Sequence, residues 1–428
     1  MAASSVAASP AHEGGITVEY AATSCPHDGI CGGCSYRGVP YPEQLRIKNG
    51  QLRGFLDEAG VSAGVFADGS DSDCGDGVIG RAESGVPYPG VAPAPHTSAY
   101  RNRMDYSFGD EVKDGAMTLG LHKSGSYMSV IDTDGCLIVP GDFNVIRAAV
   151  LDWARAAGHG FWHKRSHRGF LRSLVLRRGE ATGELLVNLV TTDDEAMDGA
   201  AFAGMLLGLQ IEGTIAGVLH TTYNGRADTV ACDAMEILYG RDHYFENMLG
   251  LRFRVNALSF FQTNTSAVEA MFTEAFDMLP RLEGKSVCDI YCGTGTISLS
   301  LARRAASVTG IEIIPESVYA ARENAALNGI DNCRFIPGDA LEALESLEAR
   351  PDVIVVDPPR MGLHPKALKK IMSYGLPELL YISCNPKTFA RDMAAMQEFG
   401  YRLDTLRAYD NFPYTRHTEL AARIVRRR

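Results

Sequence analysis

The sequence lacks long apolar runs, a secretory signal and an excess of positive charge. None of its apolar stretches approaches the roughly 18 residues that a membrane-spanning helix needs, so we expect no membrane partner. The opening residues, MAASSVAASPAHEGG, contain neither a basic segment nor an apolar one, which indicates a disordered leader rather than a signal peptide. The protein is therefore expected in the cytoplasm.

The formal net charge of −11 argues against indiscriminate binding to nucleic acid, but a local basic face remains compatible with it. One stretch, HKRSHRGFLRSLVLRRG over residues 163–179, concentrates cations: Lys164, Arg165, Arg168, Arg172, Arg177 and Arg178. The C-terminus adds Arg426, Arg427 and Arg428. Such runs are as often solvated surface as nucleic-acid contacts, so the sequence leaves both readings open.

The distribution of residue types along the sequence predicts three parts. Residues 1–95 hold the leader, a cysteine cluster, a helix over 42–60 and a linker rich in Gly, Pro, Asp and Ser. Residues 96–255 consist mainly of short strand-like segments and form a predicted β-rich central domain. Over residues 256–428 buried strands alternate with helices, which indicates an α/β domain with a doubly wound, Rossmann-like sheet.

A glycine loop opens the third part. The segment DIYCGTGT, residues 289–296, follows a strand and begins a helix, and Gly293 and Gly295 allow a tight turn and close approach to a ligand. Glu312 ends the next strand, where its carboxylate can accept hydrogen bonds from ribose hydroxyls. Asp339 follows the third strand and suits an adenine amine.

A nicotinamide pocket would share much of this geometry. It expects a third glycine, however, and here Ile297 and Ser298 occupy that part of the helix. The fourth strand ends in DPPR, residues 357–360, which dehydrogenases do not need. A pocket with carboxylates for ribose and adenine but without the pyrophosphate fingerprint suits S-adenosylmethionine better.

The fifth strand ends in SCNP, residues 383–386. Cys384 and Asp357 should both face the cofactor, because open α/β sheets bind ligands at the carboxyl ends of their strands. Pro386 suits the first turn of the following helix, whose N-terminus should lower the pKa of Cys384. An isolated cysteine would more often be a core residue, but its position beside Asp357 and the cofactor favours a nucleophile.

The chemistry gives this cysteine a task. Carbon 5 of uracil is a poor nucleophile, and thiolate attack on carbon 6 turns it into an enolate that can take up a methyl group. A base must then remove the proton from carbon 5. Glu419, in RHTE, is the candidate base, and its bland interpretation is a surface carboxylate before the last strand.

Five blocks in order, FFQTN, DIYCGTGT, DPPRMGL, SCNP and RHTEL, resemble the RNA uridine-5 methyltransferase family over residues 256–428. The resemblance implies a class I methyltransferase domain with Cys384 as nucleophile and Glu419 as base. His417 receives no role beyond packing or a supporting contact. The cofactor contacts that the resemblance implies are Gln262, Tyr291, Thr296, Glu312, Asp339 and Asp357.

Two related classes fit less well. RNA cytosine-5 methyltransferases place a cysteine after the proline of the fourth-strand motif, and here that position is Pro359. Adenine-amino methyltransferases need an aromatic residue after Pro-Pro to stack on the base, and here it is Arg360.

Three cysteines, Cys25, Cys31 and Cys34, precede the first helix, and Cys136 is the best distant fourth ligand. Zinc sites with four cysteines usually use two close pairs, and radical S-adenosylmethionine enzymes use a Cys-x3-Cys-x2-Cys spacing that this sequence lacks. Three close cysteines and one distant one suit an iron–sulfur cluster. Family members with this arrangement carry a [4Fe-4S] cluster, so we expect one here, with zinc as the alternative.

Within the family, the cysteine cluster resembles that of the ribosomal RNA enzymes more than the bacterial transfer RNA ones. The resemblance therefore implies an enzyme, expected to be a monomer, that methylates a uridine of 23S rRNA. A tRNA uridine is the alternative target, and a non-catalytic, metal-stapled RNA-binding protein is the rival from another class. Many family members carry an N-terminal RNA-binding barrel, which we expect to be absent here because only 24 residues precede Cys25. Arg101 and Arg103 are candidate phosphate contacts.

Overall fold

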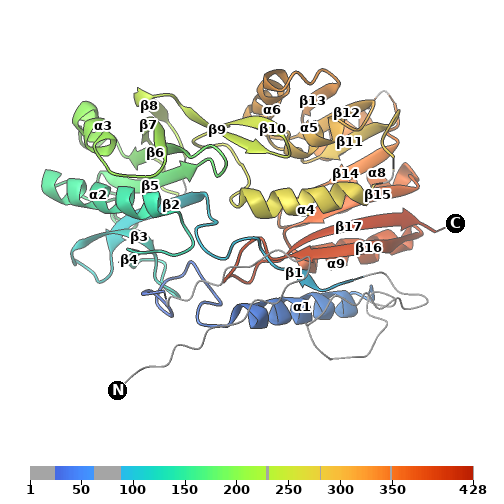
Figure 1. Cartoon of the computed structure of the whole chain (residues 1–428), viewed down its shortest axis with the longest axis horizontal. Coiled ribbons are helices and arrows are strands. Elements are labelled where there is room, and N and C mark those ends of the chain that lie inside the picture. Colours follow the sequence, from blue (N-terminus) through green and yellow to red (C-terminus); the bar gives the residue numbers. More distant parts are fainter. Residues whose placement is uncertain (1–24, 62–87, 228–230, 280, 348, 428) are drawn as a thin grey trace.

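The computed structural model describes residues 25–61, 88–227, 231–279, 281–347 and 349–427. The predicted leader and most of the predicted linker, which contains Cys74, lie outside these residues. Two halves lie side by side, a β-rich half built from β2–β8 and an α/β half built from β11–β17 (Figure 1). No helix in the described part of the chain is both long and apolar enough to cross a membrane.

The first half contains a seven-stranded sheet in the order β4-β3-β2-β5-β6-β7-β8. Its neighbours are antiparallel except β6 and β7, which run parallel because α3 connects them. Helices α2 and α3 supply Phe143, Ile146 and Phe202 to the core beneath it. The elements are β2 Arg103–Asp110, β3 Met117–His122, β4 Val130–Asp132, α2 Gly141–Ala157, β5 Leu171–Arg178, β6 Glu184–Thr191, α3 Gly199–Leu207, β7 Thr214–Thr222 and β8 Ala234–Gly240.

The second half contains an eight-stranded sheet in the order β1-β16-β17-β15-β14-β11-β12-β13. Strands β11–β15 are parallel as predicted, whereas β17 pairs antiparallel with both β15 and β16. The elements are α4 Thr265–Asp277, β11 Ser286–Ile290, α5 Thr296–Ala302, β12 Ser307–Glu312, α6 Pro315–Leu327, β13 Cys333–Pro337, α7 Ala340–Glu345, β14 Val353–Val356, α8 Pro365–Ser373, β15 Glu378–Ser383, α9 Pro386–Glu398, β16 Tyr401–Tyr409 and β17 Glu419–Arg426.

A hairpin of β9 (His243–Met248) and β10 (Leu251–Asn256) joins the halves. Its buried Tyr244 and Phe253 share one apolar cluster with Leu219 of the first half and Phe272 of α4. This shared core fixes the two sheets relative to each other.

The N-terminal helix α1 (Tyr41–Glu58) belongs structurally to the α/β half. It packs beside α9 and β1 (Val91–Ala92), and β1 adds a parallel edge strand to β16 (Figure 1). Leu52 and Leu56 enter the same core cluster as Phe389 and Met393 of α9. The division into three parts stays a prediction, but the helix of the first part is packed into the third.

Candidate active site

The register of the second sheet brings the predicted site residues to one edge. Ser383, the last residue of β15, pairs with Leu420 of the antiparallel β17. The next position along β15 is Cys384 and the previous one along β17 is Glu419, so these two residues follow the last rung of the ladder. Val356 pairs with both Ile290 and Tyr381, which places Asp357 at the same edge. Residues far apart in sequence therefore meet because three parallel strands, β11, β14 and β15, end where the antiparallel β17 begins.

A cavity of about 840 Å³ opens at this edge, which lies within the size range of small-molecule sites. It also reaches the first half of the molecule through Arg101, Arg103 and Asp105. Of the predicted cofactor and catalytic residues, it is lined by Gln262, Tyr291, Thr296, Glu312, Asp357, Cys384 and Glu419.

The glycine loop has the predicted shape. Gly293 and Gly295 adopt left-handed φ angles of 53° and 89°, and Gly295 precedes the first residue of α5. A Cβ atom on Gly295 would lie 3.1 Å from the Cβ of Ala321, so the close packing there also requires glycine. The Glu312 carboxylate accepts hydrogen bonds from the amides of Gly293 (3.1 Å) and Ile314 (2.8 Å). These bonds orient it toward the cavity as a ribose-binding group would require.

Asp339 does not line the cavity. Its carboxylate accepts a hydrogen bond from the Leu341 amide at 2.9 Å and caps the N-terminus of α7. Asp289, the first residue of DIYCGTGT, also stabilises the local structure. Its carboxylate accepts a 2.6 Å hydrogen bond from the Ser298 hydroxyl beneath the glycine loop. Complete burial raises the pKa of Asp289 to about 7.

Cys384 precedes Asn385, the N-cap residue of α9, whose side chain accepts from the Lys387 amide. The expectation of a lowered thiol pKa is wrong. Burial, together with the charges on Glu419 and Asp357, raises the pKa of Cys384 to about 12, although Arg360 acts in the opposite direction. The helix N-terminus does not compensate for two neighbouring carboxylates in a partly buried site.

Both carboxyl groups beside Cys384 also hold their protons tightly. Burial raises the pKa of Asp357 to about 7. Burial and the charge on Asp357 raise the pKa of Glu419 to about 8, while Arg360 and Lys48 lower it. Glu419 is thus a buried carboxyl with a pKa close to neutrality, as a general base at physiological pH requires. Because its side chain is only 9% exposed, it is not the surface carboxylate of the alternative interpretation.

Several cavity residues were not predicted. Phe260 is 63% exposed at the cavity although its FFQTN block was recognised. Arg360 was used only to exclude another enzyme class, yet its charge acts on both Cys384 and Glu419. His417 lines the cavity, where burial lowers its pKa to about 4 and keeps it neutral. No periodicity or motif could have identified the electrostatic influence of Lys48.

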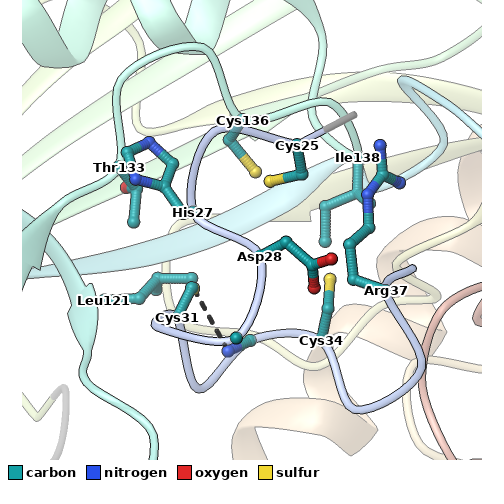
Figure 2. Close-up of a pocket in the computed structure, with 12 residues that line it drawn as sticks. Cys25, His27, Asp28, Cys31, Cys34, Arg37, Leu121, Thr133, Cys136 and Ile138 are labelled. Carbon is teal, nitrogen blue, oxygen red and sulfur yellow. Dashed lines mark hydrogen bonds between the residues drawn. The ribbon is translucent and has the colours of Figure 1, made fainter. Parts of the chain in front are cut away.

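A second cavity collects the cysteine cluster. Cys25, Cys31, Cys34 and Cys136 line it together (Figure 2). The cysteine loop reaches the central sheet through backbone hydrogen bonds, from Gly32 to the His122 carbonyl and from Ser124 to that of Ile30. This pairing explains how a cysteine about a hundred positions away joins the other three.

Three of these four thiols have raised pKa values. Burial, followed by the charges on Cys136 and Cys31, raises the pKa of Cys34 to about 12, and burial also raises the pKa of Cys31 and Cys136. A bound cation would reverse these shifts, because metal ligation deprotonates thiols. Nevertheless, no group of three or more His, Cys, Asp and Glu side chains in the described ranges meets the geometry of a metal-ion site.

The basic stretch is only partly surface. Arg172 lies between the rings of Trp162 (4.4 Å) and Tyr223 (4.5 Å) and donates to three carbonyl groups. Arg177 is 2% exposed. Arg165 and Arg168, in contrast, are exposed on the connection before β5.

Comparisons with known proteins show which proteins the chain is similar to. A family model described as tRNA (uracil-5-)-methyltransferase matches residues 244–427. An RNA methyltransferase of Caldanaerobacter subterraneus subsp. tengcongensis is 38% identical over 92% of this chain and 83% of its own length. One from Clostridium tetani is 38% identical over 94% of this chain and 84% of its own.

The chain belongs to the RNA uracil-5-methyltransferase family. The crystal structure of Pyrococcus abyssi tRNA (uracil-54, C5)-methyltransferase in complex with S-adenosyl-L-homocysteine shares its fold, with a TM-score of 0.72, 25% identity and coverage of 92% of this chain and 86% of that one. The predicted family, the α/β methyltransferase fold and S-adenosylmethionine as the methyl donor are thereby confirmed.

The raised pKa of Glu419 makes stability depend on pH. Its ordinary value of 4.5 rises to about 8 in the folded protein, so the folded state binds this proton more tightly than the unfolded chain, and stability should fall as pH rises through that interval. Glu419→Gln removes this titration. We expect the melting temperature of the variant, relative to the unmodified protein, to increase from pH 5 to pH 8. A difference in melting temperature between the variant and the unmodified protein that stays constant with pH would contradict the assignment. Glu58→Gln, at an exposed carboxylate of α1, serves as control.

Proposed function

We propose that this protein transfers a methyl group to carbon 5 of a specific uridine in 23S rRNA through a covalent bond between Cys384 and carbon 6. The observation that carries the proposal is the antiparallel register that sets Cys384 opposite Glu419 in one cavity. Glu312 and Gln262, which line the same cavity, would hold the methyl donor, along with Tyr291, Thr296 and Asp357. Asp339 would act at most behind this layer, since its carboxylate caps α7.

The reaction divides between the two residues. The Cys384 thiol gives its proton to water as sulfur bonds to carbon 6, and the electrons of the 5,6 double bond move onto the carbon 5 and carbonyl system. S-adenosylmethionine, when bound, supplies a methyl group activated by its sulfonium charge, which carbon 5 takes up. The Glu419 carboxylate then accepts the proton from carbon 5, the double bond re-forms, and the bond from carbon 6 to sulfur breaks. The thiol pKa of about 12 makes the sulfur a good nucleophile once it is deprotonated.

The choice of RNA rests on the cysteine segment, which is similar to that of the rRNA enzymes of the family. A tRNA uridine is the second candidate, because the structural relative from Pyrococcus abyssi is a tRNA (uracil-54, C5)-methyltransferase. The target base would leave its stack to enter the cavity. One chain supplies every residue named for the site, so we propose that a cytoplasmic monomer is active.

We further propose that the four cysteines hold a [4Fe-4S] cluster, with Cys25, Cys31, Cys34 and Cys136 as ligands. Support comes from the donor set, because four thiols converge on one cavity. The cluster would fix the cysteine loop to the central sheet rather than take part in the methyl transfer, which involves no net electron transfer.

The covalent mechanism predicts a trapped complex. RNA with 5-fluorouridine cannot release a proton from carbon 5, so incubation with cofactor should give a complex that survives denaturation. We expect it with the unmodified protein and with 23S rRNA in preference to tRNA. Cys384→Ala should abolish it, whereas Cys232→Ala, at an exposed cysteine, should not. An adduct that persists in Cys384→Ala would refute the mechanism, and preferential trapping of tRNA would select the second target.

The metal assignment predicts a brown protein after anaerobic purification. About four iron atoms and four sulfides per chain, the content of the cluster type, should be recovered. Cys34→Ser should lose both, and Cys232→Ser should retain both. Stoichiometric zinc without sulfide would instead establish the alternative metal.

The exposed arginines predict a salt-dependent RNA contact. Arg165→Ala/Arg168→Ala should weaken RNA binding at every sequence and lower the slope of log K against log salt by about 2, one unit for each phosphate contact. Arg334→Ala/Lys369→Ala removes two exposed cations of the α/β half and should leave the slope unchanged. Equal slopes of log K against log salt for the two double variants would exclude Arg165 and Arg168 as RNA contacts.

A further inference from the structure

The loop that joins β16 to β17, residues 410–418, lines part of the cavity and immediately precedes Glu419. Its cavity-lining residues are Asn411, Phe412, Thr415 and His417. Elements elsewhere in the chain hold it in place. The Asp410 amide donates to the Ala92 carbonyl of β1, the Asn264 side chain donates to the Asn411 carbonyl at 2.7 Å, and the Tyr100 hydroxyl donates to the Pro413 carbonyl at 2.8 Å.

Helix α1 supplies two buried polar side chains to the same loop. Gln44 and Lys48, one turn apart, are each 0% exposed. The Lys48 ammonium donates to Asp410 Oδ1 at 2.5 Å and to the Phe412 carbonyl at 3.3 Å. The Gln44 Oε1 accepts from the Tyr414 amide at 2.8 Å. Two side chains on the inward face of α1 therefore form hydrogen bonds with residues at both ends of the central turn of the loop.

The cysteine loop holds the same turn from its other side. Tyr414 adopts a left-handed φ of 66°, a conformation that a tyrosine rarely takes without support. Its carbonyl accepts hydrogen bonds from the amides of Ser35 (2.9 Å) and Tyr36 (2.8 Å), directly after Cys34. The Arg37 guanidinium lies 4.1 Å from the centre of the Tyr414 ring.

Stability alone is a weak reason for an ion pair at this position. Burying Lys48 and Asp410 has a desolvation cost that apolar residues of similar volume would avoid. The usual benefit of such a pair is a unique arrangement of the groups that it joins. Here the arrangement is that of the loop leading into Glu419, and the charge of Lys48 also favours the ionised form of that carboxyl.

We propose that Lys48, acting through Asp410, is a positioning residue for the proton-abstracting step, so that α1 places the Glu419 carboxylate against carbon 5 without touching the RNA or the cofactor. Gln44, acting through Tyr414, has the same role at the other end of the turn. The inference rests on the proposed function, because it assigns Glu419 to the removal of that proton.

The proposed role of Lys48 and Gln44 concerns only one step, the removal of the proton from carbon 5. Bond formation between Cys384 and carbon 6 and the methyl transfer both precede proton removal. A misplaced Glu419 carboxylate leaves the proton on carbon 5, so the bond between carbon 6 and sulfur cannot break. Methylated RNA should then remain attached to the protein.

The test is a single turnover of Lys48→Met with cofactor and RNA that contains ordinary uridine. We expect methyl transfer within about twofold of the unmodified protein but release of methylated RNA slowed up to about 100-fold, the cost of a displacement near 1 Å. The denaturation-resistant complex should accumulate and carry the transferred methyl group. Gln44→Met should likewise slow the release of methylated RNA more than the methyl transfer.

Controls separate positioning from general damage. Arg46→Met removes an exposed cation from the same helix, paired only with Glu43 among the contacts described for it, and should leave both steps unchanged. If Lys48→Met does not melt cooperatively, Lys48→Met/Asp410→Asn decides instead, because it removes the unpaired charge and keeps the acceptor for the Phe412 amide, 3.1 Å from Asp410 Oδ1. A folded variant with normal release, or with transfer and release slowed equally, overturns the inference. Failure of the unmodified protein to trap 5-fluorouridine RNA would instead overturn the proposed function.

Discussion

The proposed active site depends on the fact that parallel strands end at one edge of a sheet while an antiparallel neighbour begins there. Strands β11, β12, β14 and β15 deliver the glycine loop, Glu312, Asp357 and Cys384 to this edge, and β17 runs the other way and starts with Glu419. A single rung of the ladder, Ser383 with Leu420, therefore sets the two proposed reactive groups opposite each other. A slip of one residue in this register would turn Glu419 to the other face of the sheet.

Bringing these groups together places several acids in one poorly solvated cleft. Burial raises the pKa of Asp357 and Glu419, and their charges in turn raise that of Cys384. The site at rest therefore favours a neutral thiol, which is less open to oxidation than a thiolate. Lys48 and Arg360 are the cations that offset this accumulation of negative charge at Glu419, one from beneath the loop and one beside the cavity.

Sequence patterns predicted what depends on local order along the chain. The strands that carry Glu312, Asp357 and Cys384 and the left-handed glycines of DIYCGTGT lie where hydrophobic runs and turn residues placed them. Contacts between distant segments could not be read in this way. Arg172 and Arg177 looked like surface cations but are buried in carbonyl and aromatic contacts, and Asp339 caps a helix too short to be recognised from periodicity.

The pKa of Cys384 shows the same limit in energetic terms. A helix N-terminus is visible in the sequence, and it does favour a thiolate. Its effect is that of a partial charge, whereas Glu419 and Asp357 each bring a full charge near a partly desolvated sulfur. Which effect prevails depends on the spacing across β15 and β17, which their antiparallel ladder sets. Helix α1 and the cysteine loop in turn hold the 410–418 loop that leads into Glu419. The reactivity of Cys384 is thus a property of the assembled fold, including the N-terminal segment that at first sight stands apart from the catalytic half.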